Sequence, residues 1–232
     1  MEQGPRQPVV DDVPRGTVIS GDMNKVEASE LCGLCPGESL ATGRHWATLL
    51  SRFAESVFRW SGRISLVSAG DRHSLVNKHI LPAVALRPLI LSVPHGSVWD
   101  VGSGAGFPGV PLAVTMPDTK FLLIESRRRR ASFLREAVRE LPLPNAVVVH
   151  AFLDGGLSLA RSHAPADVIV SRAAMSVVQL HACVRGGTAA KAVSVTTLSP
   201  GETLPSDCLD SHGWCIDGHQ GSAVLRRVCV EQ

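Results

Sequence analysis

A glycine-rich segment near the middle of the chain has the residue types of a nucleoside-binding turn. Gly102, Gly104 and Gly106 follow a short apolar run, and Asp100 stands directly before the first of these glycines. Glycines permit a sharp turn and let a ligand approach the backbone closely. Glu125 ends the next apolar run, about 20 residues further on, where a carboxylate can accept hydrogen bonds from both ribose hydroxyls. The spacing predicts a nucleoside site at the edge of a parallel sheet.

The same glycines fit two ligands and one purely structural role. Residues 104–109 match the GxGxxG pattern of dinucleotide-binding turns, but a carboxylate at Asp100 would repel a pyrophosphate. Pro108 also removes a backbone N–H that would otherwise face phosphate at the start of the following helix. A nucleoside with a cationic amino-acid arm, S-adenosylmethionine, fits better, with Asp100 orienting that arm. A dinucleotide and a plain glycine turn are the alternatives.

Further candidate residues lie outside the glycine segment. Asp154 can reach the adenine amine from the loop after the third apolar run. Arg172 follows the fourth run, at the edge where substrates of open α/β sheets bind, and can contact an RNA phosphate or the cofactor carboxylate. His79 either faces this site or packs in the core. Phe107 and Trp60 are the aromatic candidates for stacking on bases, and Trp60 is expected in the core.

Four consecutive arginines, Arg127, Arg128, Arg129 and Arg130, open the predicted helix 127–141. Cations are disfavoured at the N-terminus of a helix by the direction of its dipole, so their presence there needs another explanation. Contact with RNA phosphates is one explanation, and extension of the side chains into water is the other.

Alternating strand and helix patterns position these residues. The predicted strands are 97–101, 120–124, 146–149, 167–170 and 189–197, and the predicted helices between them are 110–116, 127–141 and 176–184. Alternation of this kind predicts a parallel sheet covered on both faces by helices. Residues 198–222 are expected to form a loop, and 223–230 to pair antiparallel at an edge of the sheet.

Helical patterns precede this alternation. Apolar residues from Trp46 to Trp60 recur at helical spacing, which predicts an amphipathic helix that ends at Gly62. A second helical segment, 72–91, contains two prolines and is expected to be kinked or broken.

The chain is predicted to have three parts. Residues 1–37 are rich in Pro, Gly, Asp and Ser and are predicted to form a mobile acidic leader, with a short helical turn around 25–34. Residues 38–95 form an N-terminal helical region, and residues 96–232 form the cofactor-binding core.

Composition excludes several classes of protein. A chain of 232 residues with 44% hydrophobic residues can bury a core, so a wholly disordered chain is excluded. The net charge of +2 combines −4 in residues 1–38 with +6 in the remainder, which suits either a polyanionic partner or an ordinary surface. Without a membrane span or an export signal, we expect a cytoplasmic protein. Cys32 and Cys35 have zinc or redox spacing, but ordinary free thiols are favoured and no metal site is expected.

Residues 100–113 resemble the signature of the glucose-inhibited division protein B family, the methyltransferases of guanine N7 in 16S ribosomal RNA. The resemblance spans about residues 46 to 187. Its other matching segments are Leu123–Ser126, Arg129–Leu134, Leu143–Asn145, Asp167–Ala173, Trp60–Leu66 and His79–Leu81.

The resemblance implies a Rossmann-like, doubly wound class I methyltransferase with an N-terminal helical extension. It implies S-adenosylmethionine as cofactor and 16S rRNA or the small ribosomal subunit as partner. We also expect a monomer. The implied cofactor-binding residues are Asp100, Gly102, Ser103, Gly104, Gly106, Phe107, Glu125, Asp154 and Arg172. The candidate RNA-binding residues are those of the arginine run, Arg127, Arg128, Arg129 and Arg130. Guanine N7 carries a free lone pair and no proton, so no general base is expected, and Arg172 is assigned to positioning.

The chain departs from the family pattern at several positions. Pro82 and Ala83 replace an Asp-Ser pair, Ser65 replaces an Asn, and Phe152 replaces an Arg. The match also fades after Gly187, so the C-terminal part is expected to be shortened. These departures leave two alternatives: a ribosome-associated module that binds cofactor without turnover, and a methyltransferase of small molecules.

Overall fold

The fold was obtained as a computed structural model, which describes residues 25–153, 159, 161–172, 176–184, 186–198, 208–216 and 219–228. The described helices all precede or connect strands of one sheet. They are α1 (Ala28–Leu34), α2 (Leu40–Ser61), the 3-10 helix η1 (Ala69–Ser74), the π-helix η2 (Val76–Ile80), α3 (Leu81–Val84), α4 (Arg87–Leu91), α5 (Gly109–Thr115), α6 (Arg128–Glu140) and α8 (Val177–Val184).

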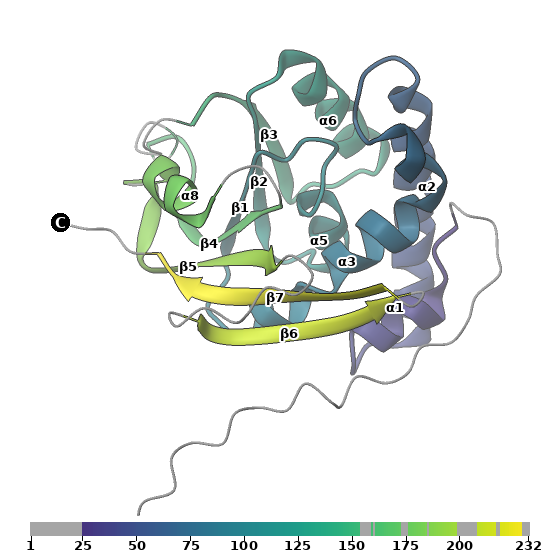
Figure 1. Ribbon diagram of the computed structural model, residues 1–232, viewed down its shortest axis with the longest axis horizontal. Helices are drawn as coiled ribbons and strands as arrows, with labels where there is room; N and C mark the ends of the chain where they lie inside the picture. Colours follow the sequence, from purple (N-terminus) through teal and green to yellow (C-terminus); the bar gives the residue numbers. More distant parts are fainter. Residues whose placement is uncertain are drawn as a thin grey trace, which may run out of the picture.

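Seven strands form a single sheet in the order β3-β2-β1-β4-β5-β7-β6 (Figure 1). They are β1 (Ser97–Val101), β2 (Lys120–Glu125), β3 (Ala146–His150), β4 (Ala166–Ser171), β5 (Thr188–Leu198), β6 (Cys208–Ile216) and β7 (His219–Arg227). The first five strands pair in parallel, and β7 runs antiparallel to both β5 and β6. Strands β2 and β3 follow on one side of β1, and β4 and β5 follow on the other side, so the direction of the strand order reverses between β1 and β4. The predicted doubly wound, mostly parallel sheet is therefore confirmed.

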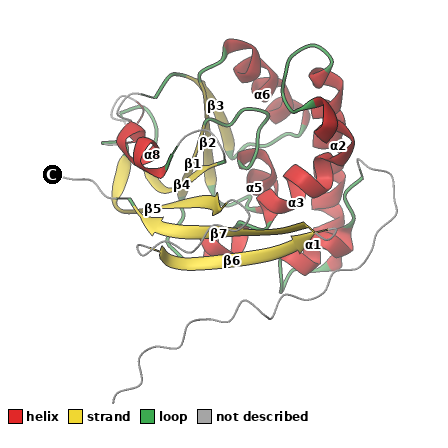
Figure 2. Ribbon diagram, in the orientation of Figure 1, coloured by secondary structure: helices red, strands yellow, loops and turns green. Residues whose placement is uncertain are grey.

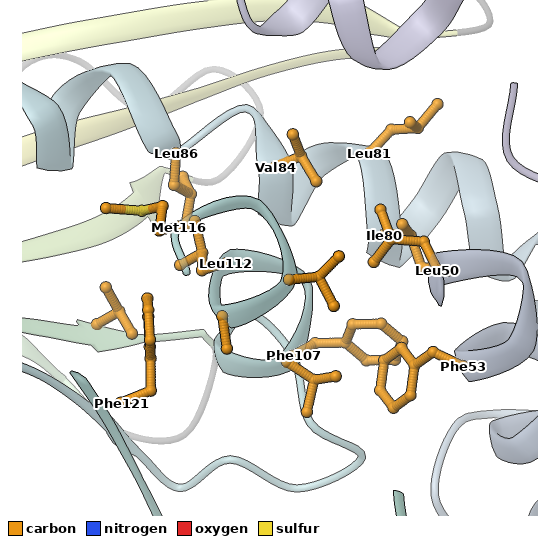
Figure 3. Packing of buried hydrophobic residues seen from close by; sticks show 14 of the residues in the cluster. Leu50, Phe53, Ile80, Leu81, Val84, Leu86, Phe107, Leu112, Met116 and Phe121 are labelled. Carbon is orange, nitrogen blue, oxygen red and sulfur yellow. The ribbon is translucent and has the colours of Figure 1, made fainter. Parts of the chain in front are cut away.

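Two hydrophobic clusters cover the two faces of the sheet. Figure 2 shows helices α5 and α8 on either side of the parallel strands. Successive residues of β1 point to opposite faces, so Val98 belongs to the larger cluster and Trp99 to the smaller one. The larger cluster contains residues of α2, α3, α5 and α6 and includes Phe53 and Phe107 (Figure 3). The smaller cluster includes Leu180 of α8. Burial on both faces explains why β1 is mainly apolar in sequence, with Ser97 and Asp100 as its polar residues.

Helix α2 forms where the amphipathic pattern predicts it. The Ser39 hydroxyl caps its start by accepting from the Thr42 backbone N–H at 3.1 Å, and Gly62 is the C-cap. Leu50 and Phe53 are fully buried on its inner face. This helix supplies the wall against which the glycine-rich segment packs.

The helical segment that follows is broken, as the prolines predict. Pro82 lies in the first turn of α3 and Pro88 in the first turn of α4, where a missing backbone N–H costs nothing. The π-helix η2 directly precedes α3 and carries His79.

Two predictions about the C-terminal part are wrong. Residues 208–216 and 219–222 were expected to be loop, but they belong to the antiparallel pair β6 and β7. The tail was expected at the edge of the sheet, whereas β7 lies between β5 and β6, and β6 is the edge strand (Figure 1). The sequence pattern of residues 208–216 did not predict a strand, because β6 forms by pairing with the free edge of β7 and not through a strand pattern of its own.

The helical layer begins further upstream than the predicted boundary of the leader. The expected turn around residues 25–34 is present as α1, and Leu31 and Cys35 are fully buried. Burial raises the pKa of the Cys35 thiol to about 11.

Within the described ranges no three His, Cys, Asp or Glu side chains come together as a metal-binding group. None of the described helices is both long enough and apolar enough to cross a membrane.

Candidate functional site

The glycine segment forms the turn between β1 and α5, at the carboxyl edge of the sheet. Gly102, Gly104 and Gly106 have φ angles of 74°, 58° and 91°, a region that favours glycine. The backbone N–H groups of Gly102 and Ser103 donate to the Ile124 carbonyl at 2.9 and 3.1 Å, which fastens the turn to β2. The Ser103 hydroxyl donates to the Asp100 carbonyl at 3.0 Å. The backbone is therefore held in a fixed course past the strand ends.

The glycines of this turn have different surroundings. A Cβ on Gly104 would meet nothing closer than the Gly102 carbonyl oxygen at 3.7 Å, so one side of this residue is open. A Cβ on Gly106 would lie 2.9 Å from Phe53, and a Cβ on Gly109 would lie 2.4 Å from Asp100 Oδ2. Gly104 is therefore the position where a ligand can approach the backbone, whereas Gly106 and Gly109 are required by internal packing.

Glu125 joins the glycine turn to the start of α6. Its carboxylate accepts from the Gly104 backbone N–H at 2.8 Å through Oε2 and from the Arg127 backbone N–H at 2.7 Å through Oε1. The side chain is almost fully buried at the end of β2. Each carboxylate oxygen has further acceptor capacity. The two bonds support the helix-capping alternative and also place the carboxylate beside the open side of Gly104.

Asp100 is completely buried beneath the first turn of α5. Its Oδ2 accepts from the Gly109 backbone N–H at 3.0 Å, while Oδ1 has no hydrogen-bond partner in the described structure. Burial raises the pKa of this carboxyl to about 7, although the Ser103 hydroxyl, the Gly109 N–H and the Arg172 charge oppose the shift. A buried carboxylate oxygen without a partner is costly, and a cationic ligand group would relieve that cost.

Arg172, His79 and Phe107 pack together on the same side of the sheet as Asp100. The Arg172 guanidinium donates to His79 Nδ1 and lies 5.4 Å from the centre of the Phe107 ring. The His79 ring stacks on Phe107 with a centroid distance of 5.1 Å. Figure 3 shows Phe107 beside Phe53 in this cluster. Phe107 is therefore buried in packing, so it offers no open face for a base, and its contact with cofactor stays a prediction.

His79 is neutral in this arrangement. Burial, with the nearby Arg172 charge, lowers the pKa of His79 to about 4. Its Nδ1 accepts from Arg172, so the proton must reside on Nε2, which has no hydrogen-bond partner in the described structure. Asp71 Oδ2 lies 3.8 Å from Nε2, but with a neutral imidazole this contact is no ion pair. Burial also lowers the pKa of Arg172, while the Asp100 and Asp71 charges oppose that shift.

The structure brings most of the predicted cofactor residues to one edge of the sheet. Gly104, Glu125, Asp100 and Arg172 come from β1, β2, β4 and the turns after them. Asp154 lies outside the described residues. The predicted site did not include the contact between His79 and Arg172, which are 93 residues apart. The only sign of it in the sequence is that both are polar residues next to apolar segments.

The predicted RNA-binding arginines lie at the start of α6. Arg128 and Arg129 line a surface cavity of about 430 Å³ together with Trp60, Arg63, Ile64 and Ser132. Arg130 is not among the residues that line this cavity and donates to the Ser65 carbonyl at 2.7 Å. Ser65, one of the departures from the family pattern, thus accepts this hydrogen bond through its backbone carbonyl and not through its side chain. Phe152, another departure, is 82% exposed.

These residues fit a nucleoside with a cationic arm. The partnerless Asp100 Oδ1 suits an ammonium group, the open side of Gly104 suits a close backbone approach, and Glu125 suits a diol. A pyrophosphate would instead meet two carboxylates here, so the dinucleotide alternative is disfavoured.

Comparison with known proteins gives one family. The family model described as rRNA small subunit methyltransferase G matches residues 47–188 of the chain. Ribosomal RNA small subunit methyltransferase G from Xanthomonas campestris pv. campestris is 39% identical over 106 residues, which cover 46% of this chain and 49% of the relative. The protein of the same name from Nitrosomonas europaea is 36% identical over 138 residues, or 60% of this chain and 61% of the relative. The match to the first of these relatives thus spans about half of its length.

Solved structures share the fold at low sequence identity. An O-methyltransferase from Bacillus cereus in complex with SAH has a TM-score of 0.51 at 11% identity, over 76% of this chain and 90% of that chain. The cofactor-bound protein Rv0187 from MTB has a TM-score of 0.52 at 16% identity, over 85% of this chain and 94% of that chain. The predicted class I methyltransferase fold is therefore confirmed.

Proposed function

Because the chain belongs to the rRNA small subunit methyltransferase G family, we propose that it transfers a methyl group from S-adenosylmethionine to guanine N7 of 16S rRNA. The family resemblance seen in the sequence is confirmed by the family model and by the relatives. The observation that carries the proposal is the cofactor edge itself, where the end of β1 and the turn after it supply both the partnerless buried carboxylate oxygen of Asp100 and the open side of Gly104.

Each part of the proposed cofactor meets a residue of suitable chemistry. Asp100 faces the ammonium group, and Gly104 gives the amino-acid arm close access to the backbone. Glu125 accepts from the ribose hydroxyls. Arg172 binds either the cofactor carboxylate or an RNA phosphate, for which its guanidinium has donors beyond those bound to His79 and Lys78. Asp154 is proposed for the adenine amine, and Gly102, Ser103, Gly106 and Phe107 for the surrounding wall.

The chain's task in the proposed reaction is to hold two partners in line. When bound, S-adenosylmethionine supplies an electrophilic methyl group on a positively charged sulfur. Guanine N7 has an in-plane lone pair and no proton, so the protein needs no base to activate it. The neutral His79, whose Nδ1 lone pair is already engaged by Arg172, is in keeping with this. Positioning at near-attack distance is therefore the proposed source of the rate enhancement.

Several finer statements belong to the same proposal. We propose the small ribosomal subunit as the partner, the cytoplasm as the location, and a monomer as the active form. The division into a helical region and a cofactor-binding core of residues 96–232 is also proposed, and the packed helix α1, which was expected in the leader of residues 1–37, belongs to the helical region.

A labelled-methyl assay tests this function. The protein is incubated with S-adenosylmethionine carrying a labelled methyl group and with small subunits from a strain that lacks the modification. We expect label in 16S rRNA and none in small-molecule acceptors. Cofactor binding in calorimetry without any transfer would instead support the non-catalytic module that the departures at Pro82, Ala83 and Phe152 suggest. Transfer to small molecules alone would support the third alternative.

A further inference from the structure

The cavity between the end of α2 and the start of α6 combines positive charge with an apolar wall. We call it the basic pocket and define it by Trp60, Arg63, Ile64, Arg128, Arg129 and Ser132. Its volume of about 430 Å³ is within the range of pockets that hold small ligands, roughly 300–1,000 Å³. The two helices lie side by side (Figure 1).

The arginines of the basic pocket lack the carboxylate partners that other arginines have. Arg59 pairs with Glu140, Arg87 with Glu38 and Arg139 with Glu136. In the described part of the chain, no carboxylate lies within ion-pair distance of the three arginines that line the pocket. The first turn of α6 also contains no acidic residue. Like charges gathered around one cavity repel one another, and a bound anion would relieve that repulsion.

The apolar wall indicates more than a bare phosphate. Trp60 is half-buried, and its ring meets Phe133 edge to face with a centroid distance of 5.8 Å. This contact holds the indole in place from the core side. Aromatic side chains beside arginines are the usual platform for bases of single-stranded RNA. The combination therefore suits a whole nucleotide, with its phosphate on the arginines and its base or sugar on Trp60 and Ile64.

The basic pocket adjoins the proposed cofactor site. Arg130 directly follows Arg129 in α6, and its guanidinium lies 3.8 Å from the position that a Cβ on Gly104 would occupy. The same guanidinium donates to the Ser65 carbonyl, just after Ile64. One arginine thus separates the open glycine from the basic pocket. An RNA strand that presents its target base to a cofactor bound beside Gly104 would bring a neighbouring nucleotide to the pocket.

We propose that the basic pocket binds a nucleotide of the RNA substrate that flanks the target guanine, as a second recognition site beside the cofactor. This proposal rests on the proposed function for the identity of the substrate. Arg63 and Arg129 contact the phosphate from opposite walls, and Trp60 contacts the base. The pocket positions RNA and takes no part in the transfer itself.

A matched pair of double variants tests the pocket. The pocket variant is Arg63→Gln/Arg129→Gln. The control variant, Arg44→Gln/Arg135→Gln, removes the same charge from exposed arginines of α2 and α6 that lie outside the pocket. The probe is a short single-stranded oligoribonucleotide, and its binding is followed by fluorescence anisotropy between about 50 and 200 mM salt.

We expect the pocket variant to bind the oligoribonucleotide roughly tenfold more weakly or worse, the loss typical of a hydrogen bond to a charged group. The slope of log affinity against log salt should become shallower by about 0.7, the value for one phosphate of a single strand. The control variant should keep the slope of the unchanged protein. Equal losses in both variants would overturn the proposal, because net charge alone would then explain binding.

Two further measurements complete the test. One examines the contact between Trp60 and the base, and the other distinguishes a failure of the pocket from a failure of the proposed function. An abasic oligomer of equal length keeps the phosphates and should bind the unchanged protein several-fold more weakly, and equal binding would overturn the contact with Trp60. With methyl transfer to small subunits, the pocket variant should raise KM and leave the calorimetric affinity for S-adenosylmethionine unchanged. If the unchanged protein transfers no methyl group, the proposed function is wrong, and the oligoribonucleotide measurements still show whether the basic pocket binds a nucleotide.

Discussion

Replacing Asp100 with Asn is expected to change how the stability of the protein depends on pH. The carboxyl is completely buried, and burial raises its pKa from 3.8 to about 7. A carboxyl whose pKa is higher in the folded state favours folding most when protonated, so its contribution is fully present below 3.8 and is lost as pH rises through about 7. Asparagine cannot ionise and lacks this dependence.

The size of the effect follows from the two pKa values. Each pH unit between them corresponds to about 1.4 kcal/mol, so the whole interval from 3.8 to about 7 amounts to roughly 4 kcal/mol. Within the experimentally convenient range, the free energy of unfolding of the unchanged protein should fall by roughly 2 to 3 kcal/mol relative to Asp100→Asn between about pH 5 and pH 8.

Urea unfolding followed by circular dichroism at several pH values measures this difference through the midpoint and the slope. Glu55→Gln is the control, because it removes a carboxylate from the exposed side of α2. The control should show no pH-dependent gap to the unchanged protein. A gap for Asp100→Asn that stays constant across the range would show that the folded state does not favour the protonated carboxyl, and the reasoning about its environment would be refuted.

Three substitutions test the other parts of the cofactor edge. Gly104→Asp should abolish S-adenosylmethionine binding in calorimetry with the fold retained, because Asp tolerates a left-handed φ and would fill the open side. Gly37→Asp, at another left-handed glycine with open space around it, is the control, and unchanged affinity in Gly104→Asp would show that the cofactor binds elsewhere. Glu125→Ala should weaken cofactor binding by roughly 1.5–3 kcal/mol, whereas a much smaller loss would assign Glu125 to capping of α6 alone. Arg172→Ala should raise KM for RNA or weaken cofactor binding. With both substrates saturating and methyl transfer rate-limiting, the rate should show no steep protein ionisation between about pH 6 and 9, and one that a single His or Cys substitution removes would contradict the proximity mechanism.

The sequence predicted the parallel half of the sheet well because its signals are local. Residues 97–101 form β1 as expected, since a fully buried strand reads as an apolar run and the glycines end it. Strand β6 was missed because Asp210, Ser211 and Gly213 interrupt any apolar alternation. It is a strand because β7 pairs with it, and single-sequence patterns do not contain that tertiary information.

The start of the packed chain was also difficult to predict. Helix α1 has a capping box made by two glutamates, Glu27 and Glu30, instead of the usual Ser or Thr at its start. Its burial depends on contacts with α2, among them the bond from the Val26 backbone N–H to the Ser51 hydroxyl at 2.9 Å. The surrounding composition therefore suggested a leader where the structure has a packed helix.

The site was predicted in its outline but not in its internal contacts. Strand ends of a parallel sheet meet at one edge, so the positions of Gly104 and Glu125 followed from their places in the pattern. The requirement of Gly106 for packing against Phe53 did not follow, because a glycine looks the same whether it faces a ligand or a neighbouring side chain. The bond between Arg172 and His79 joins distant segments and depends on how η2 packs onto the sheet.

Identification of the methylated nucleoside tests the central claim most directly. Small subunits that lack the modification are incubated with the protein and S-adenosylmethionine, and the 16S rRNA is digested and analysed by mass spectrometry. We predict 7-methylguanosine that appears only with cofactor and is absent with Gly104→Asp. Methyl groups on another atom of RNA, or none on small subunits under conditions where the cofactor binds, would contradict the account.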